Sequence, residues 1–164
     1  MKQRDRLGRR LPIRKIVVPV DFSKAGHVAI SYAASFANRF KASLILTHVI
    51  QRIYYADEFS YLQINTREMS QRVTKDLRTL KMRLPASLKV EIEVRKGAPF
   101  REIIAVAKEA HADLIIMATH GYTGLKHTFL GSTAERVVRH ASCPVLVVPS
   151  GTESKTPGQR RRVL

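Results

Sequence analysis

The amino-acid sequence predicts an α/β fold: a doubly wound, Rossmann-like, five-stranded parallel sheet in the order 3-2-1-4-5, with helices on both faces. Two observations support this prediction. Five short apolar runs alternate strictly with four helical patterns, and four of these five runs are continuously apolar, as strands covered on both faces require. Strict alternation of strand and helix favours right-handed crossovers, which place neighbouring strands parallel.

The predicted strands are short segments rich in Val, Ile and Leu. They cover residues 15–20, 43–49, 89–94, 113–118 and 144–148. Only the third run alternates, with apolar Val90, Ile92 and Val94 separated by glutamates. Because an alternating strand has one polar face, we expect the third strand at an edge of the sheet.

The first two helical patterns have clear start and end signals. The first follows Ser23, a good N-cap residue, and the second spans about residues 57–84 and is closed by Pro85. Apolar residues at three- and four-residue steps predict the faces that these helices bury. In the first helix they are Ala25, Val28, Ala29, Tyr32, Ala33, Phe36 and Ala37, and in the second Leu62, Met69, Val73, Leu77, Leu80 and Leu84.

The third and fourth helical patterns begin at a proline and at a serine. Pro99 suits the first position of a helix, and Ser132 is followed three residues later by Glu135, the spacing of a capping box. The residues expected to face the core are Phe100, Ile103, Ile104 and Ala107 in the third helix and Ala134, Val137, Val138 and Ala141 in the fourth.

The charge of the chain is strongly positive but unevenly placed. The 164 residues include 29 Lys and Arg against 13 Asp and Glu, a formal net charge of +16. Residues 1–14 hold six basic side chains and one acidic one, and residues 150–164 hold four and one, so these ends carry +8. We therefore expect one domain, residues 15–149, between two basic, flexible tails. A hydrophobic content of 45% argues against disorder of the domain.

Cysteine content and apolar run length exclude several classes of protein. Cys143 is the single cysteine, so a disulfide framework and a cysteine-based zinc site are excluded, and we expect an inert, buried thiol. No apolar run approaches the roughly 20 residues of a membrane span, and the N-terminus lacks the apolar core of a secretory signal. We therefore expect a cytoplasmic protein without a membrane segment.

The loop after the fourth predicted strand has the composition of a phosphate site. Three of the eight glycines, Gly121, Gly124 and Gly131, lie within residues 118–133, a stretch without acidic residues. Gly131 directly precedes a predicted helix, whose first N–H groups favour an anion. Many α/β loops use glycine and hydroxyl residues without binding a ligand, so these residues alone leave both interpretations open.

The spacing of these glycines is more specific than their number. Gly121 is followed by nine residues, then by Gly131 and Ser132, and it is preceded at a distance of three by Ala118. This stretch resembles the universal stress protein family, whose nucleotide-binding members carry Gly-x-x-Gly-x9-Gly-[Ser/Thr] between the fourth strand and the fourth helix. Ala118 replaces the first glycine. Segments 16–23, 46–49, 124–127, 134–140 and 143–148 are also similar to the family, so the resemblance covers about residues 14–149.

The resemblance implies a nucleotide site at the carboxyl ends of three strands, with ATP or another adenine nucleotide as ligand, with or without Mg²⁺. Asp21 has an equally good alternative interpretation, as a cap of the following helix. The implied contacts are Pro19, Val20 and Asp21 beside the adenosine, Val49 at the adenine through its backbone, Ala118, Thr119, His120 and Gly121 beside the ribose and phosphates, and Gly131, Ser132 and Thr133 at the phosphates.

No catalytic residue and no metal ligand are predicted. The loop lacks the Lys-[Ser/Thr] of a Walker A sequence, no GxSxG is present, and the six histidines are scattered without an HExxH pattern. Phosphoryl transfer also needs positioned charge and an oriented nucleophile. We therefore expect a stress-response or regulatory module that binds its nucleotide and hydrolyses ATP slowly at most.

Two kinds of partner are predicted besides the nucleotide. The apolar run from Val145 to Val148 would lie at a sheet edge, which favours pairing with a second copy, and the family resemblance also implies a homodimer. The basic tails favour non-specific contact with polyanions. Two alternatives stay open: a nucleotide-independent family member that acts through protein partners, and a nucleic-acid binder that uses its tails, although aromatic residues make up only 7% of the chain.

Overall fold

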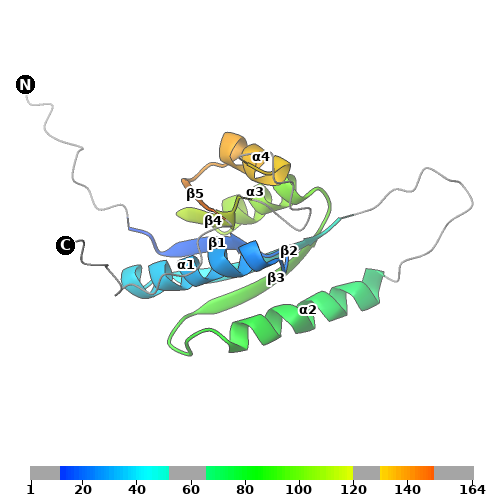
Figure 1. Ribbon diagram of the computed structural model, residues 1–164, viewed down its shortest axis with the longest axis horizontal. Coiled ribbons are helices and arrows are strands. Elements are labelled where there is room, and N and C mark those ends of the chain that lie inside the picture. The colour runs from blue at the N-terminus through cyan, green and yellow to red at the C-terminus, as the bar shows by residue number, and fades with distance from the viewer. Residues whose placement is uncertain (1–11, 52–65, 120–129, 150–164) are drawn as a thin grey trace, which may run out of the picture.

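The computed structural model describes residues 12–51, 66–119 and 130–149 (Figure 1). Its parallel strands follow the order β3-β2-β1-β4-β5, which confirms the predicted fold class. Residues 1–11 of the predicted N-terminal tail, the predicted C-terminal tail (150–164) and residues 57–65 of the predicted second helix lie outside the described residues. The elements are β1 (Lys15–Pro19), α1 (Lys24–Phe40), β2 (Ser43–Ile50), α2 (Thr66–Met82), β3 (Val90–Lys96), α3 (Pro99–Glu109), β4 (Leu114–Ala118), α4 (Ser132–His140) and β5 (Val145–Val148).

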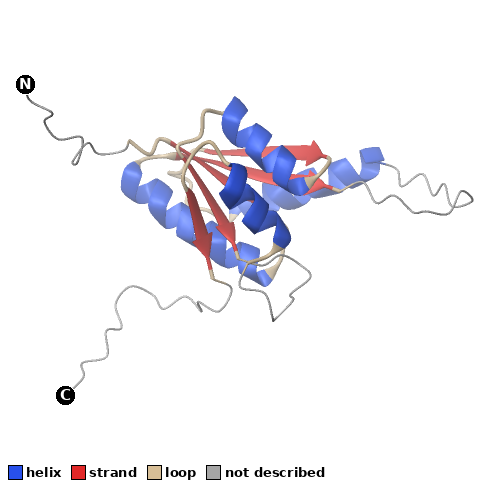
Figure 2. Ribbon diagram, turned by 90° about the horizontal axis from the view of Figure 1, so that it is seen from above, coloured by secondary structure: helices blue, strands red, loops and turns tan. Residues whose placement is uncertain are grey.

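Two helical layers enclose the sheet (Figure 2). Helices α1 and α2 cover one face, and α3 and α4 cover the other. Strands β1, β2, β4 and β5 therefore contribute side chains to two separate cores, as in Ile16 and Val18 on the α1 side and Val17 on the α3 side. All three of these side chains are fully buried, which explains why the first run is continuously apolar. The alternating strand β3 lies at an edge, as predicted.

Three side chains that were expected in the core are exposed. Tyr32 of α1 is 40% exposed, Met69 of α2 is 41% exposed and Val138 of α4 is 47% exposed. Each lies at the border of the apolar face of its helix, and the rotation of the helix against the sheet decides whether such a position is buried. Ile30 of α1 and Val106 of α3, which the sequence analysis did not include, are buried.

The predicted capping box of α4 is wrong. Ser132 is the first helical residue, and Gly131 is the N-cap, with φ −68° and ψ 150°. Glu135 instead pairs along the helix with Arg139, whose guanidinium donates to the carboxylate over 2.8 Å. The sequence pattern was correct for a helix start but placed the cap one residue late.

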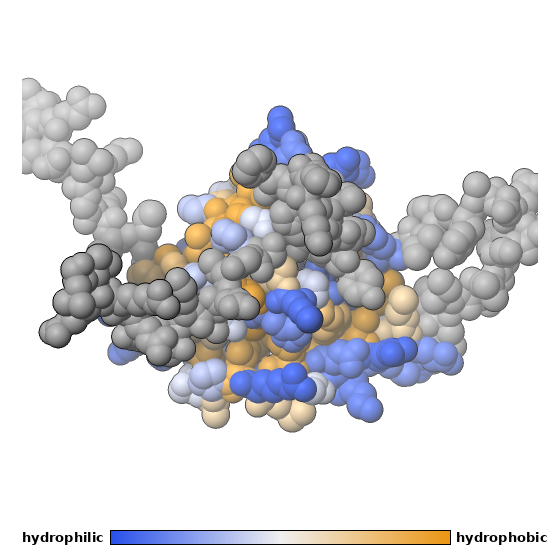
Figure 3. Space-filling view, viewed as in Figure 1, coloured by the Kyte–Doolittle hydropathy of each residue, from blue (hydrophilic) through white to orange (hydrophobic). Residues whose placement is uncertain are grey.

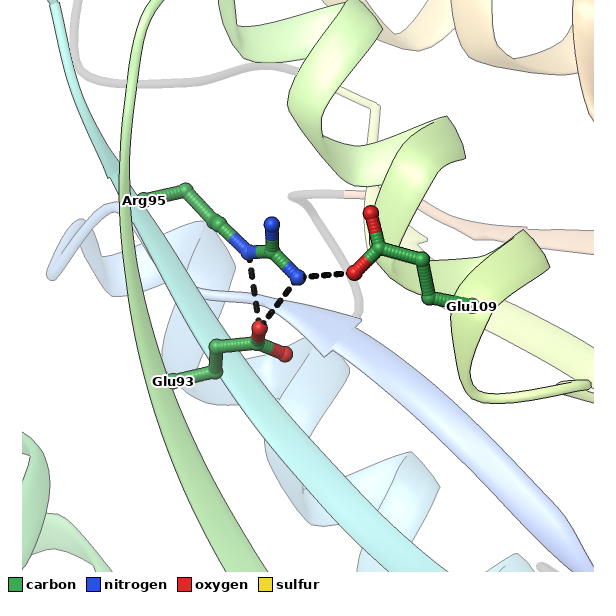
Figure 4. A network of polar contacts seen from close by, with 3 residues as sticks. All are labelled: Glu93, Arg95 and Glu109. Carbon is green, nitrogen blue, oxygen red and sulfur yellow. Dashed lines mark hydrogen bonds and ion pairs between the residues drawn. The ribbon is translucent and has the colours of Figure 1, made fainter.

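An ionic network joins the β3 edge to α3 (Figure 4). The Arg95 guanidinium donates to Glu93 on its own strand, with an Nε to Oε1 distance of 2.7 Å, and also to Glu109 at the end of α3. The hydrogen bond to Glu109 raises the pKa of Arg95, so this side chain stays charged. Glu109 is 58% exposed, so we assign the pair no more than about 1 kcal/mol of stability.

The start of α1 is held by three neighbouring residues. The Ser23 hydroxyl accepts from the Gly26 N–H at 2.9 Å, which confirms Ser23 as the N-cap. Asp21 Oδ1 accepts from the Ser23 N–H at 3.0 Å and from the Ser23 hydroxyl at 2.7 Å. A β-carbon on Gly26 would lie only 2.5 Å from Asp21 Oδ1, so the absence of a side chain at Gly26 leaves room for the carboxylate.

Cys143 lies just before β5 and is half-buried, so the prediction of a buried thiol is wrong. Burial raises the pKa of its thiol, with a further contribution from the charge of Asp113. The thiol is therefore protonated at neutral pH, in agreement with an inert cysteine.

The same Asp113 carboxylate accepts from the backbone N–H groups of Arg14 and Lys15, at 2.8 and 3.0 Å, and so anchors the start of β1. No helix within the described ranges is long and apolar enough to cross a membrane.

We predict that Leu77→Ala lowers the free energy of unfolding by about 3 kcal/mol, because Leu77 is fully buried between α2 and the sheet. Urea denaturation followed by circular dichroism measures this loss. The matched control is Met82→Ala on the same helix, which should change stability by less than about 0.5 kcal/mol since Met82 is 77% exposed. Equal losses in the two variants would contradict the packing of α2 described above.

The contact between Asp21 and Gly26 predicts coupling between two substitutions. In the Asp21→Ala background, Gly26→Ala should stabilise the protein by roughly 1 kcal/mol, the helix propensity difference between Gly and Ala. With Asp21 present, the new β-carbon displaces the carboxylate from Ser23, and that gain should disappear. A double-mutant cycle of thermal unfolding measures the coupling. The same effect of Gly26→Ala in both backgrounds would show that Asp21 does not occupy this position.

Candidate functional site

A cavity opens where β1 leaves the sheet. Strand β1 pairs with β2 only as far as Pro19 and Thr47, and the next bond, from Val20 N to the Thr47 carbonyl at 2.8 Å, is the last between them. Strand β2 continues for three more residues beside β3. The neighbouring β4 lies on the other side of β1, so the direction of winding reverses at this point. The resulting cavity has a volume of about 500 Å³.

The predicted site residues meet in this cavity. Four segments supply them: the ends of β1, β2 and β4 and the start of α4. His120 and Gly121 lie outside the described residues, as does Gly124 of the same loop. The predicted residues that line the cavity are Pro19, Val20, Asp21, Val49, Ala118, Thr119, Gly131, Ser132 and Thr133.

Asp21 both holds the start of α1 and lines the cavity. Its Oδ1 is occupied by the two hydrogen bonds from Ser23, which is the capping arrangement that the sequence left open. Its Oδ2 has no hydrogen-bond partner in the described part of the chain, and the residue lines the cavity. The two interpretations of Asp21 are therefore compatible, because one carboxylate oxygen fixes the side chain and the other is available.

The turn after Asp21 is strained and tightly held. Phe22 has φ +60°, a left-handed conformation that is unfavourable for an aromatic residue. Its ring lies against the ring of His48, with centroids 5.0 Å apart. His48 Nδ1 lies 2.7 Å from the Val20 carbonyl oxygen, so this nitrogen carries the proton and donates. In the neutral imidazole, Nε2 is then a hydrogen-bond acceptor, and His48 is one of the residues that line the cavity.

The first turn of α4 forms the anion-favouring end of the cavity. The Gly131 N–H donates to the Thr119 carbonyl at 2.7 Å, so it is not among the N–H groups left for an anion. The first helical bond runs from Glu135 N to the Gly131 carbonyl, so the N–H groups of Ser132, Thr133 and Ala134 precede it. These N–H groups and the positive end of the helix dipole attract negative charge.

Ala118 does not need the conformational freedom of glycine. It is the last residue of β4, pairs with Val148 of β5 and is not among the described residues with positive φ. The backbone at this position is therefore ordinary strand, which any residue adopts. The alanine adds one methyl group to the cavity wall and no strain.

Sequence reasoning missed the apolar walls of the cavity. Met69 and Val73 of α2 line it on one side, and Pro99 and Ile103 of α3 line it on the other. These positions carry the same signal as any core residue, so no pattern distinguishes them. Thr47 is the polar exception: it is 1% exposed, and its hydroxyl has no hydrogen-bond partner within the described ranges.

Few of the described residues that line the cavity are titratable. Asp21 and His48 are the only titratable side chains among the described residues that line it. No group of three His, Cys, Asp or Glu side chains in the described ranges is placed to hold a metal ion. An apolar crevice with a helix N-terminus at one end can hold a flat ring and an anionic group together.

Comparison with known proteins gives the same assignment from sequence and from structure. Universal stress protein MJ0531 of Methanocaldococcus jannaschii is 36% identical over 140 residues, which cover 82% of this chain and 81% of that protein. The solved structure of MJ0577 from the same organism superposes with a TM-score of 0.70 at 31% identity, covering 84% of this chain and 96% of that one. A universal stress protein solved in complex with cAMP shares the fold, with a TM-score of 0.61 at 22% identity and coverage of 85% and 98%. The model of the universal stress protein family matches residues 12–149, and the chain belongs to that family.

Proposed function

We propose that this universal stress protein binds an adenine nucleotide, ATP foremost, in the cavity at the ends of β1, β2 and β4. One observation carries the proposal: residues from four separate segments converge on a single cavity of about 500 Å³ that has apolar walls and a helix N-terminus at one end. A nucleotide needs both features, because its base is flat and largely apolar while its phosphates are anionic. Binding would make the protein a stress-response or regulatory module.

The proposed ligand would lie across the carboxyl ends of β1, β2 and β4. Its base would contact Val49 through the backbone and the apolar side chains of Met69 and Ile103. The adenosine would pass Asp21, whose free carboxylate oxygen can accept a hydrogen bond. The phosphates would lie at the first turn of α4, beside the Ser132 and Thr133 N–H groups.

The same geometry favours binding without rapid turnover. Hydrolysis of ATP needs a group that orients water and charges that stabilise the transition state at the γ-phosphate. Asp21 is held by Ser23 at the end of β1, and no metal cluster exists in the described part of the chain. A Mg²⁺ ion would therefore be held mainly by the nucleotide phosphates, and we propose slow ATP hydrolysis at most.

The direct test is to identify the ligand and measure its affinity. The purified protein is denatured, the supernatant is chromatographed for bound nucleotide, and the emptied protein is titrated with labelled ATP and, separately, with cAMP. We expect saturable binding of at least one of these ligands. The absence of both bound nucleotide and saturable binding at millimolar ATP would favour a family member that acts through protein partners alone.

Gly131→Val tests the proposed position of the phosphates. The backbone at Gly131, with φ −68° and ψ 150°, is accessible to valine, so the fold should tolerate the change. The added side chain at the start of α4 should weaken ATP binding at least about tenfold, because it enters the space next to the first-turn N–H groups. Isothermal titration measures the loss. Val138→Ser is the matched control and should leave the affinity unchanged, since Val138 lies on the same helix, is 47% exposed and does not line the cavity. Unchanged affinity in Gly131→Val would show that the phosphates bind elsewhere.

We also propose a homodimer joined through β5, in the cytoplasmic location that the sequence predicts. Ile115 N donates to the Pro144 carbonyl and Thr119 N to the Val148 carbonyl, at 3.0 and 2.9 Å, so these residues of the β5 segment bond toward β4. In a parallel ladder the alternate residues, Val145 and Val147, direct their backbone groups away from β4. An edge of this kind can pair with the same edge of a second copy.

Val147→Pro should separate the proposed dimer, because proline removes an outward N–H while leaving the bonds between β4 and β5 intact. Light scattering after size exclusion should give twice the 18.5 kDa chain mass for the native protein and a mass near that of one chain for the variant. Val147→Thr keeps the N–H and should remain dimeric. A native protein that is monomeric at micromolar concentration would exclude the dimer.

A further inference from the structure

Helix α2 carries a stripe of basic side chains on its outer surface. We define this α2 stripe as Arg67, Lys75, Arg78 and Lys81, all of which are exposed. At about 3.6 residues per turn, they fall within about one third of the helix circumference, and both acidic residues of the helix fall outside that third. Figure 3 shows hydrophilic side chains gathered along this helix at the lower edge of the molecule.

No described residue neutralises the α2 stripe. None of its four side chains forms an ion pair with another described residue. By contrast, Arg95 is bound by two glutamates. Arg136 of α4 stacks over the ring of Phe100 at 5.1 Å, and Arg139 pairs with Glu135. Within the described part of the chain, the four cations of the α2 stripe therefore have no competing ion pair, and the chain has a net charge of +16, which favours an external anion.

The composition of α2 restricts which polyanion fits. Its apolar side chains Val73, Leu77 and Leu80 are buried against the sheet. The exposed apolar residues Met69 and Met82 lie about 140° apart around the helix, so they form no continuous apolar face to insert into a lipid surface. The helix contains no aromatic residue, so it offers no platform for stacking the bases of a single strand. The long cationic side chains that remain suit the regularly spaced phosphates of a duplex.

We propose that the α2 stripe binds the phosphate backbone of double-stranded nucleic acid without reading its sequence. The stripe runs from Arg67 to Lys81, a length of about 21 Å at the rise of an α-helix. A duplex carries one phosphate per strand about every 3.4 Å along its axis, so this length can meet several phosphates at once. The proposal concerns the outer surface of α2 and does not depend on occupation of the nucleotide cavity.

The test measures binding of the full chain to a fluorescein-labelled 20-base-pair DNA duplex of mixed sequence, by anisotropy at 50–200 mM KCl. The stripe variant is Arg67→Gln, Lys75→Gln, Arg78→Gln and Lys81→Gln together. The charge-matched control removes four cations from α1, its C-cap and α3 instead: Lys24→Gln, Arg39→Gln, Lys41→Gln and Lys108→Gln. Circular dichroism verifies that both variants fold, since all eight side chains are exposed.

The salt dependence decides the outcome. Each lost phosphate contact reduces the slope of log affinity against log salt by about 0.9, so the stripe variant should lose about 3 to 4 from the slope and at least tenfold in affinity at 100 mM KCl. The control should lose less than about 1 from the slope. Equal losses in both variants would overturn the proposal, as would a loss found only in the tail variant Arg160→Gln, Arg161→Gln and Arg162→Gln. Binding to phosphatidylserine vesicles but not to the duplex would overturn it as well.

Discussion

The burial of β1 and β4 between two helical layers is the constraint on which the rest of this structure depends. Val17 and Val18 of β1 and Ile115 and Ile116 of β4 are fully buried, so each of these strands needs apolar cover on both faces. The chain provides that cover by sending α1 and α2 to one face and α3 and α4 to the other. Right-handed crossovers then run in opposite directions from the centre of the sheet, and the winding must reverse between β1 and β4.

That reversal makes the cavity a consequence of the fold. After β1 ends at Pro19, β2 continues for three residues that pair only with β3. The cavity lies beside this unpaired side of β2 and is also lined by α2, α3 and the first turn of α4. The turn that leaves β1 is held from several sides, because Phe22 is strained, its ring contacts His48, and His48 donates to the Val20 carbonyl. A turn held in this way gives Asp21 a fixed position at the cavity wall.

Much of the candidate site could be predicted from the sequence, because its polar residues follow strands or begin a helix, and those positions have local signals. Ser23 and Ser132 mark helix starts, and Asp21 follows directly after an apolar run. The apolar walls could not be predicted in this way. Met69 and Val73 belong to the cavity only because α2 packs against β2 and β3, and the other cavity residues are far from α2 in the sequence.

The sequence by itself determined the order and type of the elements, because continuous apolar runs and 3.6-residue periodicity are local consequences of burial. It also determined the family, through the spacing of Gly121, Gly131 and Ser132. Only the tertiary structure decided the rotation of each helix, which exposes Tyr32 and Val138, and the use of the Gly131 N–H to close a loop. These features depend on the surface against which each helix packs. That surface is formed by residues from other parts of the chain, so no single segment determines it.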